Sequence, residues 1–307
     1  LISRVAVTDA NVLVLGESGT GKDMVAWFIH DRSHRRTAPL VTIDCASLPE
    51  ALLESELFGY EKGAFTGASE TKPGRFEAAD GGTIVLNEIA SLASASQAKL
   101  LRVIEDRSFE RLGGKQQIKI DVRLIALANV DLKEAVRAHT FRDDLYYRLN
   151  VVTIEMPRLS QRVEDIPKLT EQFARHFGSR AGRPAVNVGP EAVSMLGDYD
   201  FPGNVRELRN IIEQSVLASD DNVIAPDDLP EYLRSAARIM HSQKHKPTLA
   251  EVEAVYISEV LEFTRGNKTR AAEILGISRK NLYEKMRRYN IGALKGGAQL
   301  DELGQSA

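Results

Sequence analysis

Short, continuously apolar runs alternate with segments of helical periodicity over the first half of the chain. Apolar runs that do not alternate with polar residues are typical of strands covered on both faces of a parallel sheet. Such strands are predicted at Asn11–Leu15, Leu40–Asp44, Thr83–Leu86, Val122–Ala128 and Val151–Met156. Helices are predicted between them, at Lys22–Asp31, Glu50–Leu57, Ser96–Asp106 and Leu132–Ala138. Strands that alternate with helices predict a layered α/β fold.

The strand pattern ends near residue 163, and helical periodicity takes over. Helices are predicted at Val163–Phe177, Pro190–Tyr199, Val205–Leu217 and Pro226–Ala236. A polar stretch that ends in Pro247 follows, then a second helical region and a glycine-rich tail. We therefore expect an α/β subdomain over residues 1–162, a helical subdomain over 163–236, a linker over 237–247, an all-α domain over 248–291 and a flexible tail over 292–307.

The composition is that of a soluble globular protein. Of the 307 residues, 43% are hydrophobic and 27% are charged, which argues against a disordered chain. No apolar run approaches the roughly 18 residues that span a bilayer, which excludes a transmembrane helix. The chain starts at Leu1 without a signal peptide or an initiating Met, so we expect a fragment of a longer, cytoplasmic protein. Cys45 is the only cysteine, which excludes an internal disulfide and a multi-cysteine metal site, and we expect it to be a small buried residue.

Positive charge is concentrated near the C-terminus. Residues 264–291 contain eight Lys or Arg and two Glu, a net charge of +6, in a chain whose total charge is -3. A small basic segment on an acidic body is an electrostatic indication of nucleic-acid binding. Charge alone fits a solvated helix face equally well.

The clearest chemical motif is Gly16-Glu17-Ser18-Gly19-Thr20-Gly21-Lys22, which follows an apolar run and opens a helix. This is the context of a Walker A loop. The glycines let backbone N–H groups converge on phosphate oxygens, and the helix N-terminus and Lys22 add positive charge. Asp23 stands where such loops usually have Ser or Thr, so this position offers no hydroxyl to a metal. The residues predict a site for nucleotide phosphates.

Polar residues close two further predicted strands. Glu88 is placed to orient a water for attack on the γ-phosphate, and Asn87 stands where an Asp normally supports Mg²⁺. Asn accepts a hydrogen bond from a metal-bound water but carries no charge, so we expect weakened Mg²⁺ support from Asn87. Asn129 closes another strand and is placed to sense the γ-phosphate. A simple strand-ending turn is the alternative for Asn87 and Glu88, and the nearby phosphate loop makes it the lesser one.

Two arginines stand far in sequence from the phosphate loop. Arg142 and Arg148 lie in Phe141–Asn150. An arginine that acts on the nucleotide of a neighbouring subunit stabilises transition-state charge. Their spacing alone favours ordinary ion pairs with Asp143 or Asp144.

Together these residues resemble the AAA+ ATPases of the bacterial enhancer-binding proteins, the NtrC-like activators of sigma-54 RNA polymerase. The most specific match is Gly63-Ala64-Phe65-Thr66-Gly67-Ala68, which is identical to the GAFTGA loop of that family. Further matches are Glu56–Gly59, Gly74–Ala79, Gly81–Thr83, Phe141–Val151 and Phe201–Leu208. The resemblance covers the chain from Leu1 to Ile291. It implies an AAA+ P-loop NTPase with a parallel sheet and a helical lid, followed by an all-α helix-turn-helix domain.

The resemblance implies roles for single residues. Glu88 corresponds to the catalytic Walker B glutamate, Asn129 to sensor I, and Asp44 to a polar switch residue that holds this glutamate in an inactive pose. Arg142 and Arg148 correspond to arginine fingers. The nucleotide-binding positions are Gly16, Glu17, Ser18, Gly19, Thr20, Gly21, Lys22 and Asp23 of Walker A, Asn87 of Walker B and Arg206 at sensor II in the lid. The family has Asp at the position of Asn87, which puts hydrolysis, but not ATP binding, in doubt.

Phe65 is an unusual residue in the GAFTGA loop, because small residues and glycines cannot hold it in a rigid packed position. A mobile aromatic tip suits the capture of a partner, and a buried Phe that caps a turn is the alternative. In the family this loop engages sigma-54 and moves with the nucleotide state, so the resemblance favours capture.

The C-terminal helical region resembles the Fis-type helix-turn-helix of the same family. Thr269–Leu275 corresponds to the first helix of the motif, Ser278 to the N-cap of the second, and Arg279–Tyr289 to the recognition helix, with Leu282 and Met286 facing inward. The residues expected to bind DNA are Lys268, Thr269, Ser278, Arg279, Lys280, Asn281, Tyr283, Lys285 and Arg288. The preceding helix is expected to form a dimer face from Leu249, Val252, Val255, Tyr256, Val260 and Leu261. A helical hairpin for dimerisation only is the alternative, and the positive charge weighs against it.

Two functions from different classes follow. The first is a sigma-54-dependent transcription activator that binds ATP with Mg²⁺ and remodels the sigma-54 RNA polymerase holoenzyme by ATP hydrolysis. It is expected to bind double-stranded enhancer DNA and to form homo-oligomers, from a dimer to a hexameric or heptameric ring. No membrane partner is expected. The second is a DNA-binding regulator that binds ATP for assembly but hydrolyses it poorly because of Asn87. The GAFTGA loop, Glu88 and the two arginines favour the first. A general P-loop remodeller of proteins or DNA predicts neither this loop nor a helix-turn-helix.

Overall fold

The computed structural model describes residues 1–235, 249–264, 266–289 and 291. The chain divides into two units, Leu1–Arg234 and Ser235–Ala307. The predicted linker over 237–247 and tail over 292–307 lie outside the described residues. Among the described helices, none combines the length and apolarity needed to cross a bilayer.

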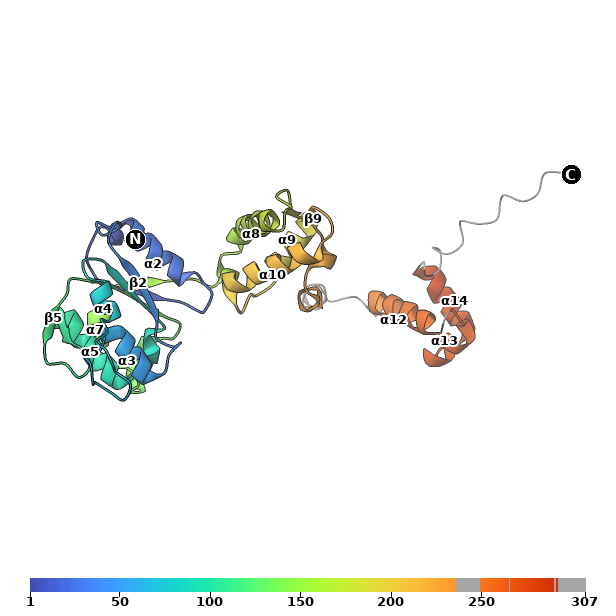
Figure 1. The fold of residues 1–307 in the computed structure, drawn as a ribbon. Coiled ribbons are helices and arrows are strands. Elements are labelled where there is room, and N and C mark those ends of the chain that lie inside the picture. Colours follow the sequence, from blue (N-terminus) through green and yellow to red (C-terminus); the bar gives the residue numbers. More distant parts are fainter. Residues whose placement is uncertain (236–248, 265, 290, 292–307) are drawn as a thin grey trace. The chain divides into compact units, whose positions relative to one another are not determined.

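A five-stranded parallel sheet organises the first part of the chain (Figure 1). Its order is β2-β3-β6-β1-β7, and every neighbouring pair is parallel. The strands are β1 (Val12–Leu15), β2 (Leu40–Asp44), β3 (Thr83–Asn87), β6 (Arg123–Ala128) and β7 (Val152–Glu155). All five predicted strands are therefore confirmed, with ends that differ by at most one residue.

Helices cover both faces of this sheet, which is why its central strands are continuously apolar. On one face, α1 (Ile2–Ala6) and α2 (Lys22–Asp31) pack against Val12, Val14 and Ile125. The other face carries α3 (Glu50–Phe58), α4 (Arg75–Ala78), α5 (Ser94–Asp106), α6 (Leu132–Arg137) and α7 (Asp143–Leu149). A hairpin of β4 (Ser108–Glu110) and β5 (Gln117–Lys119) extends beyond α5. Cys45 is buried as expected, and this burial raises the pKa of its thiol to about 12.

A helical layer with its own core follows the α/β part (Figure 1). It contains α8 (Ile166–Arg180), α9 (Pro190–Gly197), α10 (Asn204–Ala218) and the short parallel strands β8 (Asn187–Val188) and β9 (Val223–Ile224). The prediction of one helix over Pro226–Ala236 was wrong at its start. A 3-10 turn covers Pro226–Asp228, and a separate helical segment begins at Glu231. Pro230 lacks the N–H that a continuous helix would need there.

The second unit packs α12 (Leu249–Phe263), α13 (Lys268–Ile274) and α14 (Arg279–Arg288) around a small core. This core contains Val260, so the assignment of Val260 to a dimer face was wrong. Leu261 packs against the core and is only partly buried. Val255 and Tyr256 remain exposed on α12. An apolar stripe looks the same in sequence whether it is covered by a second copy or by α13 and α14. The side chains of Leu249 and Val252 lie outside the description.

Candidate functional site

The predicted phosphate loop, Gly16–Lys22, leaves the carboxyl end of β1 and enters α2. β1 lies between β6 and β7, and the Gly16 N–H donates to the Ala128 carbonyl at the end of β6, 3.2 Å away. Gly21, the residue before α2, has a φ of 100°, and no side chain caps the helix. N–H groups of the first helical turn are therefore available to an anion.

Lys22 is a buried cation beneath this loop, with 5% of its surface exposed. Its Nζ donates to the Gly16 carbonyl at 2.7 Å and to the Glu17 carbonyl at 3.1 Å. Burial lowers the pKa of Lys22, and the negative charge of Glu88 opposes this effect. Because burial penalises the ammonium, phosphate oxygens beside it would stabilise its charged form.

The polar residues predicted at strand ends share the edge of the sheet with Lys22. Asp44 pairs with Asn87 across β2 and β3, and Asn129 follows β6 on the other side of β3. Glu88 has a φ of 53°, an uncommon left-handed conformation for a residue with a side chain. Its backbone N–H donates to Asn87 Oδ1 at 3.1 Å. The oxygen of Asn87 thus already holds the backbone of the predicted catalytic residue.

The lid contacts the phosphate loop through the start of α10. Arg206 Nη1 donates to Ser18 Oγ at 2.8 Å, and the Val205 N–H donates to the Gly19 carbonyl at 3.0 Å. Gly19 has a φ of +79°, and a Cβ there would lie 2.2 Å from the carbonyl oxygen of Gly203. A side chain at Gly19 would therefore push the lid away from the loop.

Two arginines of the turn between β7 and α8 also reach the phosphate loop. Arg158 Nη2 lies 2.6 Å from Glu17 Oε1, and Arg162 Nη2 donates to the Thr20 carbonyl at 2.8 Å. Sequence reasoning did not find either arginine, because no motif distinguishes them from ordinary surface cations. Only the packing of the lid on the loop reveals these contacts.

Asn204, the first residue of α10, is the third contact that sequence reasoning missed. It is fully buried, and its Nδ2 donates to the Ser18 carbonyl at 3.1 Å and to Glu17 Oε2 at 3.3 Å. Its Oδ1 accepts the Leu159 N–H at 2.9 Å. One amide side chain therefore joins the phosphate loop, the turn that leads to the lid, and the lid itself.

Arg142 and Arg148 are paired within their own chain. Arg142 donates from Nε and Nη2 to the two carboxylate oxygens of Asp144, at 3.0 and 2.7 Å. Arg148 Nε donates to Glu105 at 2.8 Å. In the ranges that the structure describes, no hydrogen bond or ion pair joins either guanidinium to the phosphate loop. The ion pair between Arg142 and Asp144 is one of the two that the sequence spacing favoured.

The GAFTGA loop, Gly63–Ala68, is closed by backbone hydrogen bonds from Gly63 N to Ala68 O at 2.8 Å and from Ala68 N to Phe65 O at 3.0 Å. Phe65 is 45% exposed. Its ring packs edge-on against Tyr60. The alternative of a fully buried Phe65 was wrong, and the expectation of an unpacked tip is corrected to a half-exposed ring with one aromatic neighbour.

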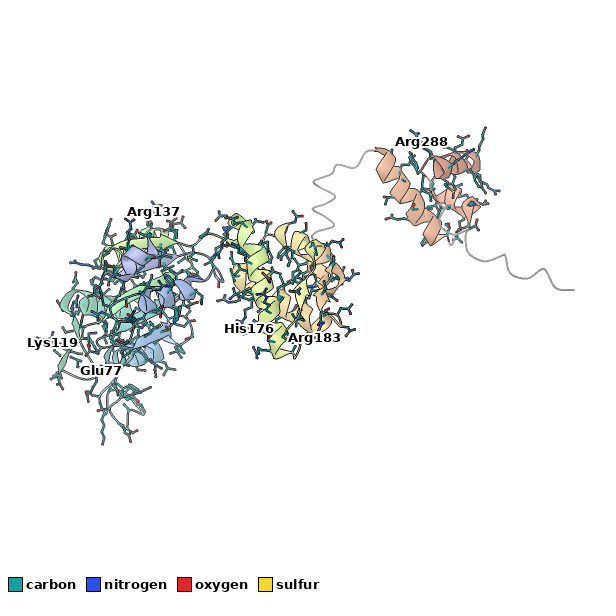
Figure 2. The ribbon with its side chains drawn as sticks, turned by 90° about the horizontal axis from the view of Figure 1, so that it is seen from above. Glu77, Lys119, Arg137, His176, Arg183 and Arg288 are labelled. Atoms are coloured by element: carbon teal, nitrogen blue, oxygen red, sulfur yellow. The ribbon has the colours of Figure 1, made fainter. Side chains whose placement is uncertain are left out.

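The base of this loop is held by Arg111, which follows β4. Arg111 donates to Glu61 Oε1 at 2.9 Å and to both carboxylate oxygens of Glu77 at 2.9 and 2.6 Å (Glu77 is labelled in Figure 2). The guanidinium of Arg111 lowers the pKa of Glu77 by hydrogen bonding. Gly113, with a φ of +71°, approaches Ala64 so closely that a Cβ would lie 2.8 Å from the Ala64 methyl. The hairpin segment thus supports the loop from below.

The second unit has the geometry of a helix-turn-helix. Ser278 caps α14 by accepting the Asn281 N–H at 3.2 Å, and Leu282 and Met286 face the core, as predicted. Lys268 is half-buried, with its Nζ 5.0 Å from the centre of the Tyr283 ring. The exposed residues expected at DNA are Thr269, Ser278, Arg279, Lys280, Asn281, Tyr283 and Arg288, the last labelled in Figure 2. Lys285 differs from them because its Nζ lies 2.6 Å from Glu253 of α12.

Three family models match the chain in succession. The model described as "Sigma-54 interaction domain" matches residues 1–155, and the "AAA+ ATPase lid domain" matches residues 160–246. The model "Bacterial regulatory protein, Fis family" matches residues 248–289. The chain belongs to the family of sigma-54-dependent transcriptional activators.

Individual relatives agree with this family. Regulatory protein AtoC of Escherichia coli strain K12 is 45% identical over 94% of this chain and 64% of its own length. Transcriptional regulatory protein ZraR of Salmonella typhimurium is 49% identical over 94% of this chain and 65% of its own. The solved structure of NtrX from Brucella abortus in complex with ADP has 34% sequence identity and a TM-score of 0.72, over 94% of this chain and 67% of that one. The chain spans slightly less than two thirds of the length of AtoC and of ZraR.

Proposed function

We propose that this sigma-54 activator binds ATP at Gly16–Lys22 and hydrolyses it to remodel the sigma-54 RNA polymerase holoenzyme. The observation that carries this proposal is that the buried Lys22, at the first position of α2, lies within electrostatic reach of both Glu88 and the lid residue Arg206. Arg206 also donates to Ser18 of the phosphate loop. NtrX of Brucella abortus, a structural neighbour, was solved with ADP and with ATP. We retain the division into an AAA+ domain over residues 1–236 and a DNA-binding domain over 248–291 as part of the proposal.

The chemistry of the site is phosphoryl transfer to water. Lys22 and the first N–H groups of α2 bind the phosphate oxygens, and Arg206 adds charge from the lid. Glu88 orients the attacking water, while Asn129 and Asp44, at neighbouring strand ends, respond to the γ-phosphate and to Glu88. Positioning and electrostatic stabilisation account for most catalysis of this kind.

Mg²⁺ would enter this site with the nucleotide and be held mainly by phosphate oxygens, because the protein side chains here offer it little. Asn87 is uncharged, and its Oδ1 already accepts the Glu88 N–H. Within the described residues, no group of three or more His, Cys, Asp or Glu side chains could hold a metal ion. When bound, Mg²⁺ would neutralise charge on the phosphates, and Asn87 would support it only weakly, through a metal-bound water.

Ring assembly would bring Arg142 and Arg148 to the nucleotide of a neighbouring copy. Both guanidiniums are exposed, and in the described part of the chain each is paired with an exposed carboxylate. Such surface pairs contribute about 0–1 kcal/mol, so a phosphate chain can replace them. This supports a homo-oligomer, from a dimer to a hexameric or heptameric ring.

The other partners follow from the remaining surfaces. The half-exposed Phe65 in the GAFTGA loop supports contact with sigma-54. The exposed basic side chains at the start of α14 support binding to double-stranded enhancer DNA through the major groove.

One observation favours the second candidate, a regulator that binds ATP for assembly but turns it over slowly. Asn87 brings no negative charge to the metal, and its side-chain oxygen already accepts a hydrogen bond from the Glu88 N–H. Steady-state phosphate release separates the two when compared with Asn87→Asp. A wild-type rate within about threefold of the variant supports the activator, because one missing carboxylate then costs less than about 1 kcal/mol of barrier. A rate near background that Asn87→Asp restores supports the slow regulator.

A further inference from the structure

Asn204 combines three features that are rare in one residue. It is fully buried, it has a φ of 52°, and all of its side-chain hydrogen bonds leave its own helix. A positive φ costs energy for a residue with a Cβ and persists where surrounding contacts over-determine it. The contacts that hold Asn204 in this conformation come from the phosphate loop and from the turn at Leu159.

Both donated hydrogen bonds end on the two loop residues that precede Gly19. Ser18 offers its backbone carbonyl and Glu17 its carboxylate. The Ser18 carbonyl and the Gly19 N–H belong to one planar peptide unit, so a rotation that turns this N–H toward a phosphate also moves the acceptor of Asn204. The amide of Asn204 is held from its other side, since its Oδ1 accepts the Leu159 N–H. A movement of the loop is therefore passed to α10, where Arg206 lies two residues further on.

We propose that Asn204 is a positioning residue that couples occupancy of the phosphate loop to the placement of the lid and of Arg206. The inference rests on the proposed nucleotide site and assigns its regulation. Asn204 does not touch the nucleotide; it acts through Ser18 and Glu17. Coupling of this kind is reciprocal, so a lid detached from the loop also binds nucleotide less tightly.

Asn204→Asp tests this role with little change of shape. Asp keeps the oxygen that accepts the Leu159 N–H and loses both donations, and it places a carboxylate beside Glu17. Glu207→Gln is the matched control, because Glu207 lies on the same helix and accepts from Tyr199 Oη at 3.0 Å and from Gly203 N at 2.8 Å, inside the lid only. The readouts are ADP affinity by calorimetry and the ADP-induced protection of α10 from hydrogen exchange.

We expect Asn204→Asp to weaken ADP binding about tenfold, as loss of buried hydrogen bonds beside a charge does, and to abolish the protection of α10. Glu207→Gln should leave both unchanged. Asn204→Gly is a second variant that relieves the positive φ while removing the amide, and it should also lose the protection. If either Asn204 variant keeps wild-type protection by ADP, the coupling role is overturned.

The same role is overturned if both Asn204 variants unfold in thermal melts, because the residue then serves the fold. ADP binding by the wild-type chain separates this inference from the proposed function. A wild-type chain that binds no ADP overturns both, whereas normal wild-type binding with unaffected variants overturns only the role of Asn204. Hydrolysis enters neither readout, so a slow turnover caused by Asn87 does not affect the result.

Discussion

The Phe65 ring lies edge-on to the Tyr60 ring, with the two ring centroids 4.9 Å apart. An aromatic pair of this kind contributes about 0.5–1.5 kcal/mol beyond its buried area. Full burial of a Phe side chain against a partner contributes roughly 1.5–3 kcal/mol. Phe65 is 45% exposed, so a partner that covers the rest of the ring would add part of this burial energy to the contact that Tyr60 already provides.

We expect Phe65→Ala to keep ATP binding and to lose capture of sigma-54 by about tenfold or more, since about 1.4 kcal/mol corresponds to a factor of ten. A gel-shift assay with a transition-state analogue measures this capture, on an Asn87→Asp background so that slow hydrolysis does not interfere. Leu52→Ala, at an exposed apolar residue of α3, is the control. Normal capture by Phe65→Ala would contradict the role of the loop.

Lys22 should take up protons when nucleotide binds at alkaline pH. Burial lowers the pKa of Lys22 in the free protein, so the ammonium loses its proton at a lower pH than an exposed lysine does. Phosphate charge raises this pKa again in the complex, and affinity for ATP therefore falls as the pH rises through the lowered value. Calorimetry in two buffers of different ionisation enthalpy measures the uptake.

Two variants at Lys22 define this prediction. Lys22→Arg stays protonated at any accessible pH, so its binding should show no proton uptake. Lys22→Ala should lose most nucleotide affinity at every pH. Retention of normal affinity by Lys22→Ala would remove the basis for the phosphate site.

Arg148 should act on a neighbouring subunit, which a mixing experiment detects. Arg148→Ala and Lys22→Ala chains should each lose ATP turnover, by about tenfold or more for Arg148→Ala, since arginine fingers have large effects on rate. Mixed rings contain sites with an intact Lys22 from one chain and an intact Arg148 from its neighbour, so turnover should partly return. Asn87→Asp serves as the common background, and Arg102→Ala on α5 as a surface control. Mixed chains that stay inactive would argue for action within one chain.

Arg279 and Lys285 should differ in their effects on DNA binding. Arg279→Ala should reduce discrimination between operator and random DNA by about 1–3 kcal/mol if the side chain contacts a base. Lys285 is paired with Glu253, so Lys285→Ala should lower the melting temperature of the domain more than its DNA affinity. Fluorescence anisotropy and thermal melts measure the two effects. A larger loss of discrimination from Lys285→Ala would reverse their roles.

The local elements of this protein were predictable from its sequence. α2 has the predicted bounds, Lys22–Asp31, and Ser278 caps α14. Capping and loop-to-helix signals act within a few residues, and central strands are marked by their apolar runs. The short α1, α4 and α7 and the β4–β5 hairpin were missed, because so few residues carry no clear period.

The surface that covers an apolar stripe was not predictable. Val260 was expected at a dimer face and lies in the core of its own unit, beside Ala271 and Leu282. The partner of a charged side chain is equally hard to predict from sequence. Arg142 is paired with Asp144, but the phosphates of a neighbouring subunit's nucleotide would attract its guanidinium in the same way.

The sequence by itself determined which segments form the sheet, where the phosphate loop lies and which family motifs the chain carries. Only the tertiary structure decided which side chains meet that loop. Asn204 and Glu17 are 187 residues apart in sequence, and Arg162 reaches Thr20 across 142 residues. No local period or motif encodes such contacts, because they arise from the packing of the lid against the sheet, to which residues throughout both cores contribute.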